Sequence, residues 1–344
     1  MPTLEITTMI GCPLMCTFCP QPGLKRQYEK DNDPRVKDSK YMSLENFSRI
    51  LSKTPKHVRI DFSGMAEPWA NPDCTEMLRI ALESGYTVAV FSTLYGMSEQ
   101  DADLVVELLR KHREQIAAVC LHLPDANGNM PGWKHSKTWE NVFDKFRNLM
   151  EENVLKSFDI MTMDGSGAVH EDLHHLNLRI LPWHGHTRAG SLDESSVDKQ
   201  NIYTQTPHNT SPVSCASTPF YDHNVVLPNG DVVLCCMDYD MKHVIGNLLR
   251  QDYYDLFTGA EMNRLRRINM TPGYSACSIC KSCNQTLNYD LSSSATWTAS
   301  GDPLSHRDAT IALYRYHLDR INASPWWRFG MAITNLVRGR RAGH

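Results

Sequence analysis

The sequence lacks a long apolar segment near its N-terminus. The first residues read as a strand that leads directly into Cys12, without the run of about seven or more apolar residues that a secretory signal needs. We therefore expect a cytoplasmic protein. The net charge of −4 shows no excess of positive charge, so it gives no general argument for a nucleic-acid partner. The composition is ordinary for a globular domain, and nothing in it requires disorder or a membrane-spanning fold.

The chain has 344 residues, enough for one large domain or for a large and a small one, and it contains 11 cysteines. In an exported protein so many thiols would suggest disulfides. Without a signal segment they indicate metal or redox ligands in a reducing compartment. Their distribution supports this interpretation, because only Cys74 and Cys120 stand outside three local groups.

The first group is Cys12, Cys16 and Cys19, spaced Cys-x3-Cys-x2-Cys directly after a predicted strand at residues 4–10. A [4Fe–4S] cube takes four ligands, so three thiolates from one loop leave one iron open to another molecule. Structural zinc sites usually close with four protein ligands in a paired pattern. The spacing therefore favours an iron–sulfur cluster, with a zinc site or unrelated buried thiols as the alternatives.

Apolar strands alternate with amphipathic helices through the first half of the chain. Ser43 is a predicted N-cap, and residues 25–40 are polar without an apolar period, which predicts a loop. Alternation of strands with helices of this length predicts βαβ units and a parallel sheet. The predicted strands are 4–10, 57–63, 86–92, 116–123, 155–163 and 176–183, and the predicted helices are 44–51, 72–84, 98–113 and 136–152.

Two strands place polar residues on one face. Asp61 and Ser63 share a face of one strand, and Cys120 and His122 share a face of another. We expect both faces to line an interior chamber. His122 lies between apolar neighbours and needs a partner or a ligand, whereas Cys120 is either a chemical group or a small core residue.

The cysteine spacing, with Phe18 before the third thiol, resembles the cluster loop of the radical S-adenosylmethionine (SAM) enzymes. The resemblance implies a partial (β/α)6 barrel in residues 1–183. It also implies a [4Fe–4S] cluster whose open iron is chelated by the amino and carboxylate groups of SAM.

Further segments resemble SAM-binding parts of that family. Gly64 and Glu67, after the second predicted strand, are similar to its Gly-Gly-Glu-Pro segment, which receives SAM's amino group, although Met65-Ala66 departs from the pattern. Ser92 and its neighbour Thr93 lie where the family often contacts the ribose. Arg188 stands in an Arg-Ala-Gly segment of a predicted linker at 184–212. It would hold a carboxylate of SAM or substrate, or it is a surface arginine.

A second constellation begins at Cys215 and continues through a predicted hairpin, with an Asn-Gly turn, that ends near Cys235. Together with a later cysteine group, it resembles the SPASM or twitch domains, which implies a small α+β domain at 213–290. Because no cysteine follows Cys283, we expect one auxiliary [4Fe–4S] cluster, with zinc as the alternative. Its expected ligands are Cys215, Cys235 and two of Cys277, Cys280 and Cys283, preferably the last two.

The C-terminal segment at 291–344 contains a predicted helix at 306–321, then Trp326, Trp327 and several arginines. It docks on the protein itself or contacts an anionic membrane surface. Neither reading changes the expected chemistry.

The resemblance implies reductive cleavage of SAM to a 5′-deoxyadenosyl radical, with a flavodoxin- or ferredoxin-type electron donor. Few residues precede the barrel, so we expect no leader-binding domain and a small polar substrate such as a sugar, aminocyclitol or glycan precursor. The outcome would be oxidation, or epimerisation with a thiol such as Cys120 returning hydrogen. A peptide-modifying maturase or methyltransferase and a non-catalytic metal-binding module are the alternatives.

Overall fold

The structure, a computed structural model of the chain, describes residues 1–30, 40–162, 167–181, 187–192 and 206–288. It divides into two compact units, Met1–Leu287 and Asn288–His344. The first unit holds all the described residues except Asn288. The predicted tail at 291–344, with its helix at 306–321, lies outside the described residues. Within the described ranges, no helix has both the length and the apolar character needed to cross a membrane.

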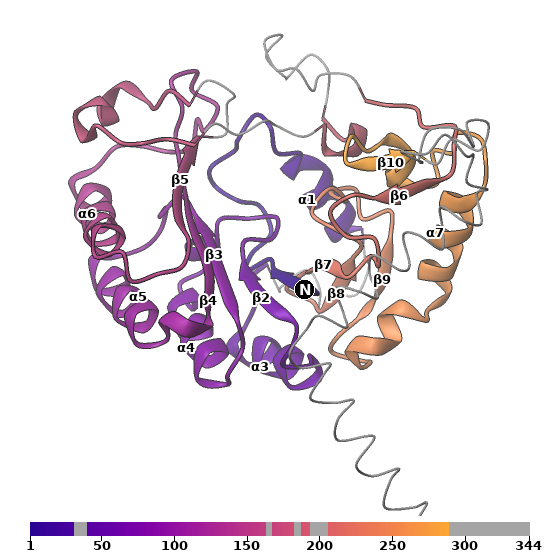
Figure 1. Cartoon of the computed structure of the whole chain (residues 1–344), viewed down its shortest axis with the longest axis horizontal. Coiled ribbons are helices and arrows are strands. Elements are labelled where there is room, and N and C mark those ends of the chain that lie inside the picture. Colours follow the sequence, from indigo (N-terminus) through magenta and orange to yellow (C-terminus); the bar gives the residue numbers. More distant parts are fainter. Residues whose placement is uncertain (31–39, 163–166, 182–186, 193–205, 289–344) are drawn as a thin grey trace, which may run out of the picture. The chain divides into compact units, whose positions relative to one another are not determined.

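An eight-stranded sheet runs through the first unit in the order β5-β4-β3-β2-β1-β7-β8-β9 (Figure 1). Strands β1 to β5 are parallel to one another, as the alternating sequence pattern predicts. Their bounds are Thr3–Ile6 for β1, Arg59–Phe62 for β2, Val88–Ser92 for β3, Ile116–Leu123 for β4 and Phe158–Thr162 for β5.

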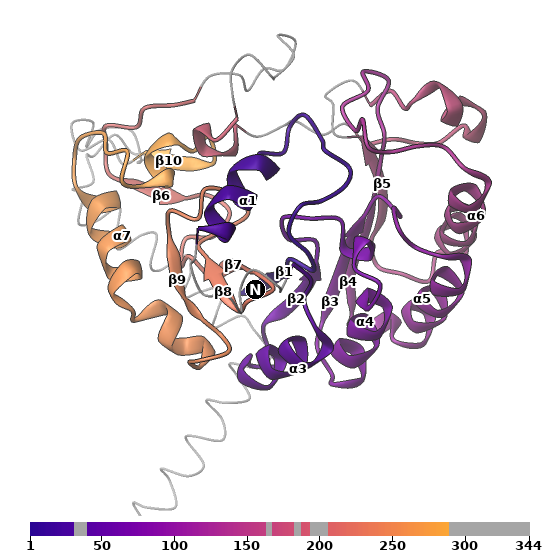
Figure 2. The ribbon, with the colours of Figure 1, turned by 180° about the vertical axis from the view of Figure 1, so that it is seen from behind.

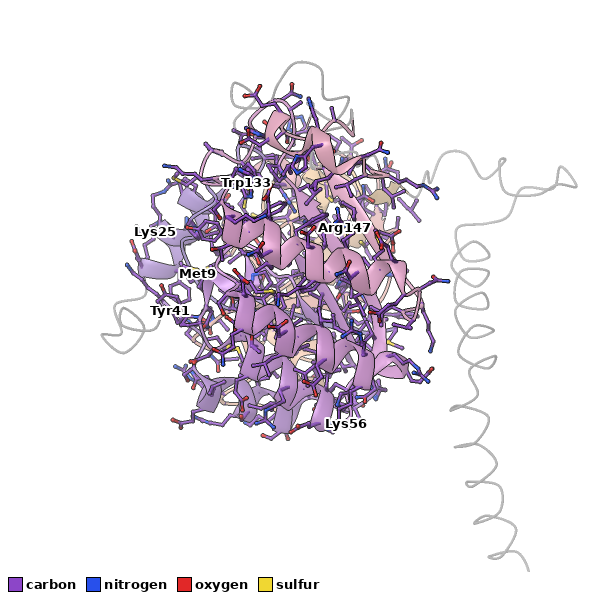
Figure 3. The ribbon with its side chains drawn as sticks, turned by 90° about the vertical axis from the view of Figure 1, so that its left-hand side faces the viewer. Met9, Lys25, Tyr41, Lys56, Trp133 and Arg147 are labelled. Atoms are coloured by element: carbon purple, nitrogen blue, oxygen red, sulfur yellow. The ribbon has the colours of Figure 1, made fainter. Side chains whose placement is uncertain are left out.

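Four helices cover one face of these strands, and serines begin three of them. Ser43, Ser98 and Ser136 each accept a hydrogen bond from a backbone N–H three residues later. Each bond satisfies an N–H that has no partner inside its helix. Figure 3 looks onto this helical side, with Arg147 of α6 labelled. The helices are α3 (Leu44–Lys53), α4 (Cys74–Glu83), α5 (Glu99–Lys111) and α6 (Lys137–Glu151).

The core lies between these helices and the sheet. Leu4, Ile60 and Val90, from three neighbouring strands, are fully buried in one apolar cluster together with Phe143 and Phe146 of α6. Because side chains alternate along a strand, the residues between these core positions point to the opposite, inner face of the sheet. That face is polar, and it carries the candidate site.

The far edge of the sheet comes from the segment predicted as a separate small domain. Strand β7 (His223–Val226) pairs parallel to β1 and forms an antiparallel hairpin with β8 (Asp231–Val233). Gly230 in its turn has φ +84°, which confirms the turn that the Asn-Gly sequence predicts. The hairpin therefore continues the barrel's own sheet, and β9 (Val244–Asn247) completes it.

The remaining elements surround this edge. Helix α7 (Ala260–Met270) packs against β9, and a second sheet pairs β6 (Val213–Cys215) with β10 (Thr286–Asn288), as Figure 2 shows from behind. One compact unit spans both the barrel and this region, so the boundaries at 183, 212 and 290 remain a prediction.

The predicted strand at 176–183 is wrong for its described part, residues 176–181. Leu176 ends a 3-10 helix, η3 (Glu171–Leu176), and the next residue, Asn177, has φ +46°. Only Leu181 reaches β5, through a single bridge to Met161. Leu178 and Ile180 still pack against the core. Their alternation therefore indicates buried side chains, but not a hydrogen-bonded strand.

The predicted loop at 25–40 is also wrong in its first part. Helix α1 (Gln21–Glu29) occupies that part, with Pro22 in its first turn. Leu24 and Tyr28, four residues apart, are buried against Val225 of β7. A proline at a helix start and this spacing were the local signals of a helix.

Candidate functional site

The loop at residues 11–20, called here the cluster loop, follows β1 and brings three thiols to one cavity. Cys12, Cys16 and Cys19 all line a cavity of about 140 Å³. The backbone folds back on itself, because the N–H of Cys19 donates to the carbonyl of Cys16 at 3.0 Å and Met15 has φ +52°. The predicted trio is therefore gathered around one space.

A second loop, which follows β4, holds the cluster loop in place. The N–H of Thr17 donates to the carbonyl of Asn129 at 3.0 Å, and the Thr17 hydroxyl donates to the side-chain oxygen of Asn129 at 2.6 Å. The N–H of Gly132 donates to the carbonyl of Leu14 at 2.9 Å. A Cβ at residue 132 would lie 2.1 Å from the carbonyl oxygen of Pro13. The two backbones are thus in direct contact, and only glycine leaves room for it.

We expect Gly132→Ala to destabilise the protein by about 1–3 kcal/mol, the usual cost of forcing an extra methyl group into a packed site. The methyl group would push the cluster loop outward, so less iron should remain bound after desalting. The measurements are the melting temperature and the iron per chain. Gly259→Ala is the matched control, since its Cβ would meet only ordinary contacts at 3.5 Å or more. Unchanged melting and iron in Gly132→Ala would contradict the expected contact.

The segment after β2 forms another wall of the cavity, lined by Gly64 and Glu67. Gly64 has φ +58°, and a Cβ there would lie 2.7 Å from the backbone of Ile6 and Thr7. The wall therefore packs backbone to backbone on the end of β1, which requires glycine at this position.

Glu67 is buried, and other residues fill its hydrogen-bonding capacity. One carboxylate oxygen accepts from the Ser92 hydroxyl at 2.7 Å and from the N–H of Trp69 at 3.3 Å. The other accepts from the N–H and the hydroxyl of Thr93, both at 2.7 Å. Burial raises the pKa of Glu67, and these hydrogen bonds oppose that rise. Glu67 thus joins the ends of β2 and β3, a role that the sequence did not indicate.

Most of the predicted cofactor residues line this one cavity. The Gln21 side chain lines it too, donating through its amide nitrogen to the carbonyl of Met65. Its buried carbonyl oxygen Oε1 has no hydrogen-bond partner within the described part of the chain, so a ligand with an N–H or O–H donor fits there. The predicted residues in the wall are Cys12, Cys16, Phe18, Cys19, Gly64, Glu67, Ser92, His122 and Arg188.

Arg188 and His122 also line the cavity. Arg188 donates to the carbonyls of Phe18 at 3.5 Å and Cys236 at 3.4 Å, so it is no free surface arginine. Burial and the charge of Arg188 lower the pKa of His122 to about 4, which leaves the imidazole neutral near pH 7. Cys120 does not line the cavity, and burial together with Asp159 raises its pKa to about 12.

The three thiols of the cluster loop favour a positively charged metal centre. Burial raises the pKa of Cys12 to about 11 and that of Cys16 further, and neighbouring thiolates add to both shifts. Such thiols lose their protons readily only when a positive centre lies beside them, as a bound metal does. No three Cys, His, Asp or Glu side chains among the described residues converge on a single ion. Cysteine thiolates are the usual ligands of an iron–sulfur cluster, so the donor set of this loop fits such a cluster.

A second group of thiols gathers between β6, β8 and the segment after α7. The pKa of Cys235 is raised well above its usual value by burial and by neighbouring thiols that include Cys280 and Cys283. The pKa of Cys280 rises to about 12 through burial, with Cys283 and Cys215 contributing. Cys280 and Cys283 are therefore neighbours of both Cys235 and Cys215, an arrangement that suits an auxiliary cluster.

Cys277 is not part of this group. Its side chain is exposed, and it interacts electrostatically with Arg264. Cys280 instead lies beside Asn269 and Ser278, which hydrogen-bond it and lower its pKa in part. The structure thus brings together the preferred pair and leaves the third candidate at the surface.

The inner face of β1, β2 and β7 carries a cluster of polar side chains, of which the sequence pattern predicted only Asp61 and Ser63. Glu5 accepts from the hydroxyl of Ser63 at 3.0 Å and lies 3.2 Å from Nε2 of His223. Arg59 pairs with Asp61 through two bonds of 2.6 and 2.7 Å. Burial lowers the pKa of His223, but Glu5 and Asp61 raise it overall. Ser63 also lines the cavity and connects the two regions.

Sequence reasoning missed Glu5, His223, Gln21 and Tyr239, which surround or line the site. Glu5 could have been found from the sequence, because an acidic residue between two apolar residues of a buried strand indicates a functional or paired carboxylate. For Tyr239, which reaches a residue 220 positions away, we find no local signal.

One family model and several solved structures match parts of this chain. Residues 215–284 match the SPASM family, an iron–sulfur cluster-binding domain. A comparison with curated protein sequences gives no match. The structure of BtrN in complex with AdoMet and 2-DOIA matches with a TM-score of 0.50 and 19% identity, covering 82% of this chain and 92% of BtrN.

Two more distant structures also align. Native anSMEcpe with bound AdoMet has a TM-score of 0.45 and 13% identity, covering 93% of this chain and 97% of that one. Streptococcus suis SuiB bound to the precursor peptide SuiA has a TM-score of 0.40 and 15% identity, covering 82% of this chain and 69% of that one.

Proposed function

Because the chain has the radical SAM fold and carries a SPASM iron–sulfur cluster-binding domain, we propose that it is an enzyme that reductively cleaves SAM and takes hydrogen from a small polar substrate. The net reaction would be an oxidation or an epimerisation. One observation carries the proposal: a single cavity gathers the three thiols of one loop with Gly64 and Glu67.

Cys12, Cys16 and Cys19 would hold a [4Fe–4S] cluster, and the second thiol group an auxiliary one. When bound, the first cluster supplies the electron that splits SAM and so generates a radical able to abstract hydrogen. The cavity contains no fourth cysteine among its described lining residues. This supports a cluster that leaves one iron for SAM.

Two side chains suit the charged groups of SAM. The unpartnered Oε1 of Gln21 would accept a hydrogen bond from the SAM ammonium. Arg188 would attract the SAM carboxylate through its guanidinium, which already lies in the wall. Glu67, as a carboxylate, would offset the positive charge of the ammonium, while its hydrogen bonds to Ser92 and Thr93 hold that wall in place.

Apolar residues protect the site from water. Leu14, Phe91 and Met130 line the cavity together with the polar groups. Exclusion of water strengthens the electrostatic contacts and prevents side reactions of reactive species. Neutral His122 lies beside Phe91, with ring centroids 6.2 Å apart, and can give or receive a hydrogen bond without adding charge.

The polar inner face of the barrel supports a small polar substrate. The interior of an α/β barrel is usually filled with branched apolar side chains, whereas the inner face of this open sheet presents Glu5, Arg59, Asp61, Ser63 and His223. Such mixed donors and acceptors suit hydroxyl and amino groups. The substrate would be a sugar, aminocyclitol or glycan precursor, and the electron donor a cytoplasmic flavodoxin or ferredoxin.

The test is an anaerobic assay of reconstituted protein with SAM, dithionite and 2-DOIA, the compound in the BtrN complex, beside myo-inositol. We expect 5′-deoxyadenosine from SAM, and a product that has lost two hydrogens if the reaction is an oxidation. In heavy water, an epimerase would instead incorporate solvent deuterium into the product. A requirement for a peptide, or formation of methylthioadenosine, would overturn the small-substrate proposal. Absence of any SAM cleavage would overturn the function as a whole.

A further inference from the structure

One side chain from the SPASM segment reaches the cluster loop. The hydroxyl of Tyr239 lies 3.2 Å from Sγ of Cys19, and Tyr239 is only 3% exposed. Tyr239 follows Cys235, a predicted ligand of the auxiliary cluster, by four residues. The same short segment therefore contacts both thiol groups.

Arg188 keeps this segment in place against the cluster loop. Its guanidinium donates to the carbonyls of Phe18 and Cys236 and lies 5.5 Å from the centroid of the Tyr239 ring. The residue after the tyrosine, Asp240, accepts a hydrogen bond from the hydroxyl of Ser191 at 3.4 Å. Arg188 and Ser191 thus hold the chain before and after Tyr239, and Arg188 also lies against its ring.

The direction of the Tyr239–Cys19 bond depends on the state of the thiol. As a free thiol, Cys19 donates its proton to the tyrosine oxygen. A cysteine bound to iron is a thiolate without a proton, so only the tyrosine O–H can then donate. Cys19 is the hydrogen-bond partner of this hydroxyl within the described residues, and the contact distance already suits the reversed bond.

We propose that Tyr239 donates a hydrogen bond to the cluster-bound thiolate of Cys19 and thereby raises the reduction potential of the first cluster. The inference rests on the proposed function, since it requires a cluster on Cys12, Cys16 and Cys19. Hydrogen bonds to ligating sulfurs withdraw electron density and stabilise the reduced, more negative cluster. Tyr239 is a positioning and tuning residue, because it contacts a ligand rather than the reacting atoms.

The test is an EPR-monitored redox titration of reconstituted wild type and Tyr239→Phe, in which added SAM identifies the signal of the first cluster. Phenylalanine keeps the ring and removes only the donor. We expect the equilibrium constant for one-electron reduction to fall about tenfold, a shift of about 59 mV to lower potential. The signal of the auxiliary cluster should titrate as before. Tyr254→Phe is the control, because Tyr254 is 60% exposed and should leave both potentials unchanged.

A second measurement detects the hydrogen bond directly. Resonance Raman spectra in light and heavy water should show a deuterium shift in an iron–thiolate stretch, which Tyr239→Phe should lose. An unchanged potential in Tyr239→Phe with full iron would overturn the inference, as would the absence of any deuterium shift in the wild type. If the wild type forms no SAM-responsive cluster, the proposed function itself fails, so the two failures are distinguishable.

Discussion

Replacing Cys12, Cys16 and Cys19 together by alanine should lower the iron content from about eight atoms per chain to about four and abolish formation of 5′-deoxyadenosine. Two cubes account for about eight irons, and only the first depends on this trio. The thiols line a single cavity, and no other cysteine lines it among the described residues. The measurements are anaerobic iron and sulfide analysis and an assay for the nucleoside.

The matched control is Cys74→Ala, which removes a buried thiol outside both groups. It should keep about eight irons. The alanine triplet should still fold, because these residues lie in a loop, and circular dichroism would confirm that. If the triple variant kept about eight irons, or if zinc replaced iron in the wild type, the first cluster would not be where we place it.

Replacing Cys280 by serine should remove the auxiliary cluster, whereas replacing Cys277 should leave it intact. Cys280 is buried beside Cys283, Cys235 and Cys215, and a serine oxygen is a poor ligand for iron that prefers thiolate. Cys277 is exposed and lies apart from these thiols. We expect about four irons per chain in Cys280→Ser and about eight in Cys277→Ser.

This pair of variants also separates an iron cluster from zinc. Loss of about four irons in Cys280→Ser, without any zinc in the wild type, supports the cluster; loss of about one zinc supports a tetrahedral thiolate site. Equal iron loss in both variants would show that Cys277 approaches the site when metal binds. Melting curves should show a lower stability for Cys280→Ser, because a metal centre bound only by the folded state stabilises it.

Local signals predicted much of this structure correctly. The serine N-caps, the strand and helix alternation, the Asn-Gly turn and the spacing of the first three thiols are all short-range features. Gly64 shows the limit of such signals, because its turn is local but its contact with the backbone of Ile6 joins the ends of two strands that are distant in the chain. Two local predictions were wrong in their described parts, the start of the loop at 25–40, which α1 occupies, and residues 176–181 of the predicted strand. In both segments the apolar side chains are buried by elements that are distant in the chain, and the local sequence pattern does not show which side chains these are.

The sequence by itself determined where the first cluster loop lies and that the chain alternates strands and helices, because these depend on residues close together in the chain. Only the tertiary structure decided which later cysteines converge, that β7 extends the barrel's sheet, and that Tyr239 reaches Cys19. It also brought Glu5 and His223 together on the inner face. These contacts join positions up to 220 residues apart. Such pairs are set by the packing of whole elements against one another, which no spacing along the chain encodes.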